Sequence, residues 1–493
     1  MVMYKRPHRP ACALARTVLV GALLATGLAG CAALGPNYQR PTLDVPGSLP
    51  VPASTSAGTG SAQAVPAPVD LPVWWQAFQD PILDTLLAEA AQNNQDLLLA
   101  AGRIVEARAN EAIANANRFP AVDATAGASR SRSRASQSTA RLPPGAPAVN
   151  KDFQVGLNAS YEIDFWGKFS RADEAARARL LSQQANRGVV LTSLHTSIVQ
   201  NYFALRAYDA QLALAVAALQ TRQENLRLQR KRFAAGSVGT LEMHQAESEV
   251  AGTEVTRAQA QQAVAVTEAA LAVLAGRSPR AIATPQIARG AAIDALYGRL
   301  TAPVDLPADL LNRRPDIVAA EQALVAANAD IGQARAQYFP SIRLTTGIGY
   351  ESNVLKNLIS PESLLWNLGA SLAQPVFRAG AIGAVVQSAE ARKAQAQYVQ
   401  TVENAFRDVH DAITALSANE LIYGATNRRA KALKDTLRLA TLRYDNGYSS
   451  YLEVLTAQRD LLQTQASVID VQRAHMAAAV GLYRAVGGGW DSK

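Results

Sequence analysis

The stretch Leu442-Arg-Tyr-Asp-Asn-Gly-Tyr-Ser-Ser-Tyr-Leu-Glu-Val-Leu455 indicates one tight turn between two long helices. Asn446-Gly447 supplies the turn, because asparagine and glycine tolerate the left-handed backbone that ends a helix. Ser450 and Glu453 have the spacing of a capping box, in which side chains satisfy the free backbone donors of a new helix. We therefore predict a helical hairpin from about residue 394 to residue 485.

A second copy of this element lies earlier in the chain. Residues 233–242 align with residues 444–453, and the same offset of 211 positions continues downstream. The aligned pairs are Phe233 with Tyr444, Gly236 with Gly447, and Glu242 with Glu453. A unit repeated at a fixed offset indicates an internal duplication. We expect two structural repeats, at residues 73–310 and 311–493.

Both repeats contain stretches in which apolar and polar residues alternate. The alternation has no error over residues 152–164, and it recurs in residues 122–129, 342–350 and 366–372. This pattern is typical of strands with one apolar and one polar face. We predict two β-hairpins, at about 120–164 and 341–374. Four aromatic residues in them would suit a membrane-interface girdle: Phe153, Tyr161, Tyr350 and Trp366.

The predicted strands have the length of transmembrane β-strands, about ten residues each. Four strands cannot close a barrel, and open sheet edges are excluded from lipid. Other copies of the chain must therefore complete the sheet. Three copies would supply about twelve strands and leave a channel, whereas about eight strands enclose only side chains. A soluble sheet packed on helices is the alternative interpretation.

Long segments without proline follow each predicted β-hairpin. Their composition, rich in Ala, Gln, Arg, Glu and Leu, favours helix. One helix over residues 167–235 would span about 100 Å at roughly 1.5 Å per residue, too long for a compact domain. We expect helical hairpins at about 167–275 and 380–486 that form a tube, and a mixed segment at 277–309. An earlier helix should run from Pro81 to Arg118.

The first thirty residues have the features of a secretory signal peptide. Four cations without an acid precede the apolar run Thr17-Val-Leu-Val-Gly-Ala-Leu-Leu-Ala25. The segment ends in Leu28-Ala-Gly-Cys31, which resembles the lipobox of bacterial lipoproteins, so Cys31 would become the diacylated first residue of the mature chain. Residues 31–72 are rich in proline and should form an extended tether that cannot pack alone.

Charge and motifs argue against nucleic-acid binding and catalysis. The formal charge of +8 falls to +4 without the leader cations, which is weak for a nucleic-acid partner. The histidines of the mature chain are scattered, without metal-ligand spacing: His195, His244, His410 and His475. No Walker loop or dinucleotide fingerprint occurs in the sequence. We expect a protein that is not an enzyme and needs no metal or cofactor.

Five longer segments point to a known family. They are Cys31-x-x-x-Gly-Pro-Asn-Tyr-Gln-Arg-Pro41, Ser160-Tyr-Glu-Ile-Asp-Phe-Trp-Gly-Lys168, Leu306-Pro-Ala-Asp-Leu-Leu-Asn-Arg-Arg-Pro-Asp-Ile317, Ala334-x-x-Gln-Tyr-Phe-Pro340 and Leu482-Tyr-Arg-Ala-Val-Gly-Gly-Gly-Trp490. In this order they resemble the outer membrane factor (TolC-like) family, and within it the lipoprotein (NodT-type) branch from tripartite multidrug efflux systems. The resemblance covers the whole mature chain.

The resemblance implies an α+β membrane protein that acts as a homotrimer. A twelve-stranded outer membrane β-barrel would be continued by a twelve-helix periplasmic tunnel. The helical tips would meet a periplasmic adaptor (membrane fusion protein), which joins an inner-membrane transporter of the RND type. The implied function is passive conduction of drugs or other small molecules to the exterior. The alternatives are a pore-free, lipid-anchored helical scaffold and a TolC-like duct for a different export system.

The resemblance also assigns residues at the second helical turn. By motif matching, Tyr444 and Glu453 occupy positions of the family's periplasmic gate, and Glu242 is their counterpart in the first repeat. A second family acid, one helical turn after Glu453, is Thr456 here, so a double acidic ring is not expected. Capping explains Glu453 as well as gating does, and both interpretations stay open. The turns at Gly236 and Gly447 are the predicted adaptor-docking sites.

Overall fold

The protein folds into two compact units, each of which takes segments from both predicted repeats. The computed structural model describes residues 34–46, 48–49, 71–132, 149–299, 306–307, 312–390 and 392–488. Unit 1 comprises Met1–Pro41, Val105–Leu181 and Glu321–Ala396, and unit 2 comprises Thr42–Ile104, Ser182–Ala320 and Gln397–Lys493. The predicted signal peptide, Cys31 and most of the predicted tether lie outside the described residues.

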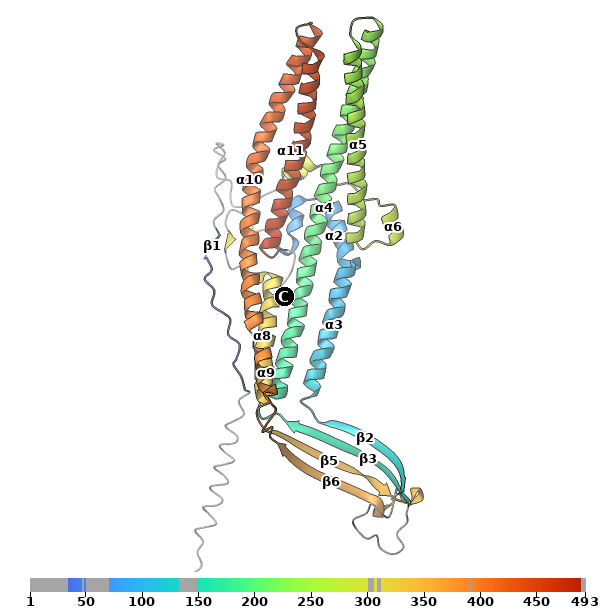
Figure 1. The fold of residues 1–493 in the computed structure, drawn as a ribbon, viewed down its shortest axis with the longest axis vertical. Coiled ribbons are helices and arrows are strands. Elements are labelled where there is room, and N and C mark those ends of the chain that lie inside the picture. The colour runs from blue at the N-terminus through green and yellow to red at the C-terminus, as the bar shows by residue number, and fades with distance from the viewer. Residues whose placement is uncertain are drawn as a thin grey trace, which may run out of the picture. The chain divides into compact units, whose positions relative to one another are not determined.

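Unit 1 contains a four-stranded antiparallel sheet in the order β2-β3-β5-β6 (Figure 1). The strands are β2 (Ala121–Arg132), β3 (Val149–Ile163), β5 (Ser341–Ser352) and β6 (Leu364–Ala373). β2 with β3 and β5 with β6 form the two expected hairpins, and β3 pairs with β5 to join them. Among the described strands, β2 and β6 therefore each pair on one side only.

The sheet has one apolar and one polar face, because side chains alternate along each strand and paired residues share a face. Leu157, Ile348 and Trp366 form one row on the apolar face. The predicted girdle aromatics share this face: Phe153, Tyr161, Tyr350 and Trp366. Leu368 and Trp366 are each 75% exposed, so a single copy leaves a large apolar surface uncovered.

Long helices make up most of the remaining structure (Figure 1). They are α2 (Pro81–Asn93), α3 (Gln95–Ala116), α4 (Lys168–Ala234), α5 (Thr240–Leu274), α8 (Pro315–Ala336), α9 (Ala381–Ala389), α10 (Arg392–Asp445) and α11 (Tyr451–Ala485). The short elements are β1 (Ser48–Leu49), η1 (Leu71–Phe78), α6 (Pro279–Ala283), α7 (Ile293–Tyr297), β4 (Leu306–Pro307), η3 (Leu355–Asn357) and η4 (Pro361–Ser363). No helix in the described part of the chain has the length and hydropathy needed to cross a bilayer.

Two expected helices are interrupted. Asn94 breaks the helix expected from Pro81 to Arg118, and its Oδ1 accepts hydrogen bonds from the backbone N–H of Asp96 (2.9 Å) and Leu97 (3.2 Å). Its Nδ2 donates to a backbone oxygen at the end of α5 (3.0 Å), so the side chain serves two helix ends. Asparagine competes with the helical backbone in this way. The first helix of the second hairpin, expected from about residue 380, is likewise interrupted at Glu390, where ψ is 124°, so that α9 and α10 are separate.

Residues 34–40, part of the predicted extended tether, pack along α8 within unit 1. We call them the N-terminal strap. A Cβ on Gly35 would lie 2.6 Å from Gly332 Cα, so the two backbones touch where both residues lack a side chain. Tyr38 donates to Glu321 Oε1 (3.1 Å), and the Arg40 guanidinium pairs with the same carboxylate. The proline-rich composition predicted that the backbone of these residues is extended. Their contacts with α8 hold that backbone in place.

The core of unit 2 begins at the predicted start of the folded body. Trp74 and Phe78 are 1% and 2% exposed, and Trp74 stacks on Tyr483 of α11 at 5.0 Å between ring centres. Asp80 follows, with its side chain capping α2 through the backbone N–H of Ile82 (3.0 Å). These contacts join the first and last helical segments of unit 2 in one core.

The carboxylate of Asp80 also holds residues 290–291. Asp80 Oδ2 accepts hydrogen bonds from Tyr202 OH (2.7 Å) and from the backbone N–H of Ala291 (3.0 Å). Tyr202 OH in turn accepts from the backbone N–H of Gly290 (3.1 Å). A Cβ on Gly290 would lie 2.2 Å from Asp80 Oδ1, so only glycine allows this approach.

The variant Tyr202→Phe should lower the free energy of unfolding by about 1–3 kcal/mol, because it leaves buried polar groups unpaired. Burial, together with the Asp80 carboxylate, raises the pKa of Tyr202 well above its usual 10.0. The Tyr202 hydroxyl therefore loses its proton at a lower pH in the unfolded state than in the folded state. Its contribution to the free energy of unfolding is fully present below pH 10 and declines as the pH rises above 10. Urea unfolding of both proteins at pH 8 and at pH 11 should show a smaller difference at the higher pH. An unchanged difference would contradict this account.

Candidate functional site at the helical turns

The two predicted turns close the helical hairpins of unit 2 with the same geometry (Figure 1). Gly236 has φ +70° and Gly447 has φ +75°, the left-handed region that favours glycine. The backbone N–H of Tyr448 donates to the carbonyl of Arg443 (2.8 Å), and a bond of the same spacing closes the first turn. Both glycines terminate their helices as expected.

Tyr444 links the two hairpins. Its hydroxyl accepts hydrogen bonds from Arg232 Nη1 (3.1 Å) and Gln229 Nε2 (3.3 Å), both on α4. The Arg232 guanidinium lies 5.4 Å from the centre of the Tyr444 ring, and Tyr451 of α11 packs against that ring at 5.3 Å. One tyrosine therefore connects α10, α11 and α4, and we call these contacts the Tyr444 network.

A small apolar cluster supports the Tyr444 network. It consists of Leu226, Ala246, Ala440, Tyr451, Val454, Leu455 and Ala457. Gln229 is 2% exposed beside this cluster. Burial raises the pKa of Tyr451, which keeps its hydroxyl neutral. The network is thus partly buried, with Gln229 on its inner side and the Arg232 side chain 34% exposed.

Arg222 is a buried cation that the sequence analysis missed. It is 6% exposed on α4 and forms an ion pair with Glu249 of α5. Burial lowers its pKa from the usual value. One signal could have identified it, because the position equivalent to Arg222 in the second repeat is Leu433. A cation that replaces an apolar residue at equivalent helix positions indicates a buried ion pair on one hairpin only.

The two candidate acids have different partners. The Ser450 side chain makes no capping hydrogen bond, so the capping box expected at Ser450 and Glu453 is wrong. The Glu453 carboxylate instead lies 3.9 Å from Arg443 Nη1, across its own turn. Glu242 is the acid that caps, because its Oε2 accepts the backbone N–H of Gly239 (3.1 Å). Each acid makes these contacts within its own hairpin, whereas the Tyr444 network bridges the two.

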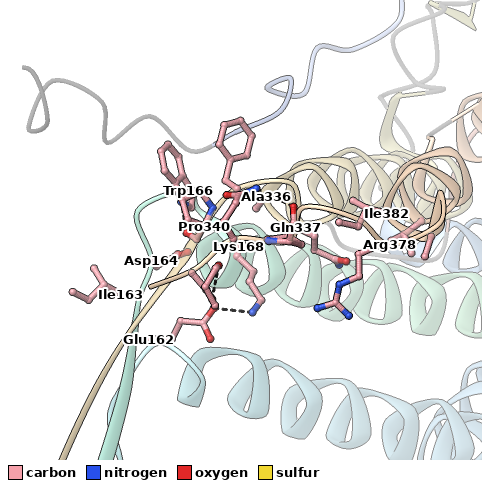
Figure 2. Close-up of a pocket in the computed structure, with 17 residues that line it drawn as sticks. Glu162, Ile163, Asp164, Trp166, Lys168, Ala336, Gln337, Pro340, Arg378 and Ile382 are labelled. Carbon is pink, nitrogen blue, oxygen red and sulfur yellow. Dashed lines mark hydrogen bonds and ion pairs between the residues drawn. The ribbon is translucent and has the colours of Figure 1, made fainter. Parts of the chain in front are cut away.

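A pocket of about 490 Å³ lies in unit 1, where the strands meet the helices (Figure 2). Glu162 Oε1 accepts a hydrogen bond from Lys168 Nζ (2.9 Å), and Glu162 Oε2 pairs with Arg343 (3.2 Å). Trp166 Nε1 donates to the carbonyl of Pro340 (2.8 Å). The motif segments 160–168 and 334–340 therefore meet here, where the strands pass into the helices.

Arg314, in the motif Arg313-Arg314-Pro315-Asp316, is a buried residue directly before the start of α8. Its guanidinium binds Asp316 (2.7 Å) and Asp408 (3.1 Å), and Nη1 donates to the carbonyl of Ala485 at the end of α11 (3.0 Å). Burial alone would lower the pKa of Arg314, but the two carboxylates raise it. This residue ties α8, α10 and α11 together.

The chain matches a family model described as "Outer membrane efflux protein" over residues 86–277 and again over residues 306–488. The cation efflux system protein CusC of Escherichia coli K12 is 34% identical over 468 residues, which cover 94% of this chain and 98% of CusC. A crystal structure of CusC superposes with a TM-score of 0.80 at 32% identity, covering 93% of this chain and 100% of that one.

Two further relatives have similar coverage. "Probable outer membrane lipoprotein SilC" of Salmonella typhimurium is 32% identical over 469 residues, 94% of this chain and 96% of SilC. The toluene efflux pump outer membrane protein TtgI of Pseudomonas putida is 34% identical over 472 residues, 94% of this chain and 96% of TtgI. The chain belongs to the outer membrane efflux protein family, whose members are the outer membrane channels of efflux systems.

Proposed function

We propose that three copies of the chain form an outer membrane channel of a tripartite efflux pump, through which drugs or other small molecules leave passively. One observation carries the proposal. The sheet of unit 1 has an exposed apolar face and, among the described strands, two edges that pair on one side only. Lipid excludes unpaired edges, so β6 of one copy must pair with β2 of the next.

Head-to-tail pairing of this kind closes into a ring when the rotation between copies fits. Three copies give about twelve strands, enough for a water-filled lumen. The polar face would line that lumen, with the Glu162–Arg343 pair on it, and the apolar face would meet lipid. The long helices would continue the channel into the periplasm as a helical tunnel.

We infer that the Tyr444 network holds the periplasmic end of this tunnel closed. Opening requires the two hairpins to separate, and the contacts of Tyr444 with Arg232 and Gln229 oppose that movement. Glu453 and Glu242 would add negative charge near the threefold axis and favour cations. The turns at Gly236 and Gly447 are the proposed docking sites of the periplasmic adaptor, which connects the channel to an inner-membrane transporter of the RND type.

We also propose that Cys31 carries lipid. Cys31 ends the lipobox-like segment, and the name of one relative is "Probable outer membrane lipoprotein SilC". In this proposal the inner-membrane transporter, and not the channel, selects the compounds that are exported. CusC and TtgI, named for cation and toluene efflux, are each 34% identical to this chain. Overall similarity therefore favours neither substrate class.

The proposed function is tested on outer membrane fractions and in planar bilayers. We expect an SDS-resistant trimer that dissociates on heating, and discrete ion conductance from the purified protein. Deleting the gene should raise drug sensitivity, and a plasmid copy should restore resistance. A monomer without conductance would instead support a lipid-anchored scaffold. Conductance with unchanged drug sensitivity would support a duct for another export system.

A further inference from the structure

Four cations lie on one exposed face of α10: Arg428, Lys431, Lys434 and Arg438. Their spacing of three, three and four residues places them in one row along the helix. The row covers about 15 Å at roughly 1.5 Å per residue. We call it the basic stripe.

The basic stripe destabilises the helix that carries it. Neighbours three or four residues apart on a helix repel each other when they carry like charges. One acid lies within the row, and Asp435 Oδ1 is 3.9 Å from Arg438. The other three cations form no ion pair with any residue that the structure describes. The stripe is therefore a concentrated positive charge left uncompensated within the chain.

The first repeat provides an internal comparison. The equivalent positions on α4, 211 residues earlier, are all exposed and carry one cation: Ala217, Gln220, Gln223 and Arg227. At this place in a hairpin, exposed helix positions can thus be occupied by alanine and glutamine and do not require cations. Exposure alone does not account for the cations on α10, so the stripe is a property of the second hairpin.

Exposed leucines adjoin the basic stripe. Leu439 and Leu442 are 49% and 56% exposed, and Leu421 is 64% exposed two turns before Arg428. Helical spacing puts all three on or beside the face of the cations. Apolar side chains next to charged ones are typical of a surface that binds another protein, where the leucines are covered and the charges fix the register. A polyanionic polymer would contact only the cations and would leave the leucines exposed.

A second copy of the chain does not supply the matching charge. α5 and α10 are the outer helices of the row of long helices in Figure 1, so α5 is the natural neighbour of α10 across copies. Most carboxylates near its turn are already engaged: Glu242 caps α5, Glu247 pairs with Arg230, and Glu249 pairs with Arg222. Glu254 alone cannot neutralise four cations.

We propose that the basic stripe binds an acidic amphipathic helix of the periplasmic adaptor. Carboxylates on one face of that helix would contact Lys431, Lys434 and Arg438, and its apolar residues would cover Leu439 and Leu442. The proposal rests on the proposed function, which supplies the adaptor. Because the first hairpin lacks the stripe, each copy binds one such helix, and a trimer distinguishes its two kinds of hairpin by charge.

The test uses the detergent-solubilised full-length protein and a fluorescent synthetic helix of about 20 residues, with glutamates on one face and leucines beside them. The stripe variant is Lys431→Gln/Lys434→Gln/Arg438→Gln. The control, Arg227→Gln/Lys231→Gln/Arg429→Gln, removes three exposed cations that do not belong to the stripe, two on α4 and one on α10. We expect the stripe variant to bind the peptide at least about tenfold more weakly, and the control to bind as the unmodified protein does. Binding should also weaken from roughly 50 to 300 mM salt.

Three results would overturn the proposal. Equal affinity of the stripe variant is the first, and equal affinity for polyglutamate or a scrambled peptide, which would indicate a general anion surface, is the second. The third is altered ion selectivity of the stripe variant in planar bilayers, because this would place the cations inside the channel. Failure of the proposed function is distinguishable, since the unmodified protein would then show no conductance at all.

Discussion

The double variant Tyr444→Phe/Arg232→Gln should raise the ratio of open to closed channels about tenfold or more. It removes the hydroxyl that accepts hydrogen bonds from Arg232 and Gln229, and it removes the guanidinium that lies over the Tyr444 ring. A hydrogen bond to a charged group contributes about 1.5–3 kcal/mol. Loss of that energy from the closed state alone shifts the equilibrium by this factor.

Single-channel conductance in planar bilayers measures the effect. The control Tyr448→Phe/Lys231→Gln likewise removes one phenolic hydroxyl and one cation, at exposed positions beside the turns, where Tyr448 is 79% exposed. The control should conduct as the unmodified protein does. Glu453→Gln should reduce cation preference without changing the melting temperature, because Glu453 does not cap α11. If the double variant only melts earlier and conducts normally, the Tyr444 network is structural and no gate.

The variant Arg314→Ala should lower the free energy of unfolding by about 3–5 kcal/mol. It removes a buried guanidinium and leaves the carboxylates of Asp316 and Asp408 without their shared cation. The carbonyl of Ala485 at the end of α11 loses its side-chain donor as well. The end of α11 should therefore separate from α8 before the rest of unit 2 unfolds.

Hydrogen exchange of the last turn of α11, together with the dissociation temperature of the trimer, measures this loss. Arg313→Ala is the matched control, because Arg313 is the exposed neighbour of Arg314 and belongs to the same motif. Arg313→Ala should change the free energy of unfolding by no more than about 0.5 kcal/mol. Equal destabilisation by both variants would show that the motif acts through its local charge and not through the buried contacts.

The strands and long helices were predictable because their signals are local. Alternation of period two assigned Leu157, Ile348 and Trp366 to one face, and the observed register keeps them there. The pairing of β3 with β5 was not predictable, since these strands are far apart in sequence and no turn sets their register. The left-handed glycines at 236 and 447 followed directly from their chemistry.

The side chains at the site were harder to predict than the backbone. Ser450 and Glu453 match the capping-box pattern, but the carboxylate turns toward Arg443. At the first turn only half of the pattern forms, from the backbone N–H of Gly239 to Glu242, because glycine has no side chain to complete it. Tyr444 was found through the resemblance, whereas its partner Arg232 was not, because an arginine near a helix end is ordinary for dipole reasons. Contacts between hairpins depend on packing that no local pattern encodes.

The N-terminal strap has a consequence for how deep the protein sits in its membrane. The backbone N–H of Leu34 donates to the carbonyl of Trp166 (3.1 Å), between the end of β3 and the start of α4. Leu34 is the third residue after Cys31, which corresponds to at most about 11 Å of extended chain. Acyl chains on Cys31 would therefore enter the bilayer level with the strand ends. They would mark a fixed depth, which lengthening or shortening residues 42–72 should leave unchanged.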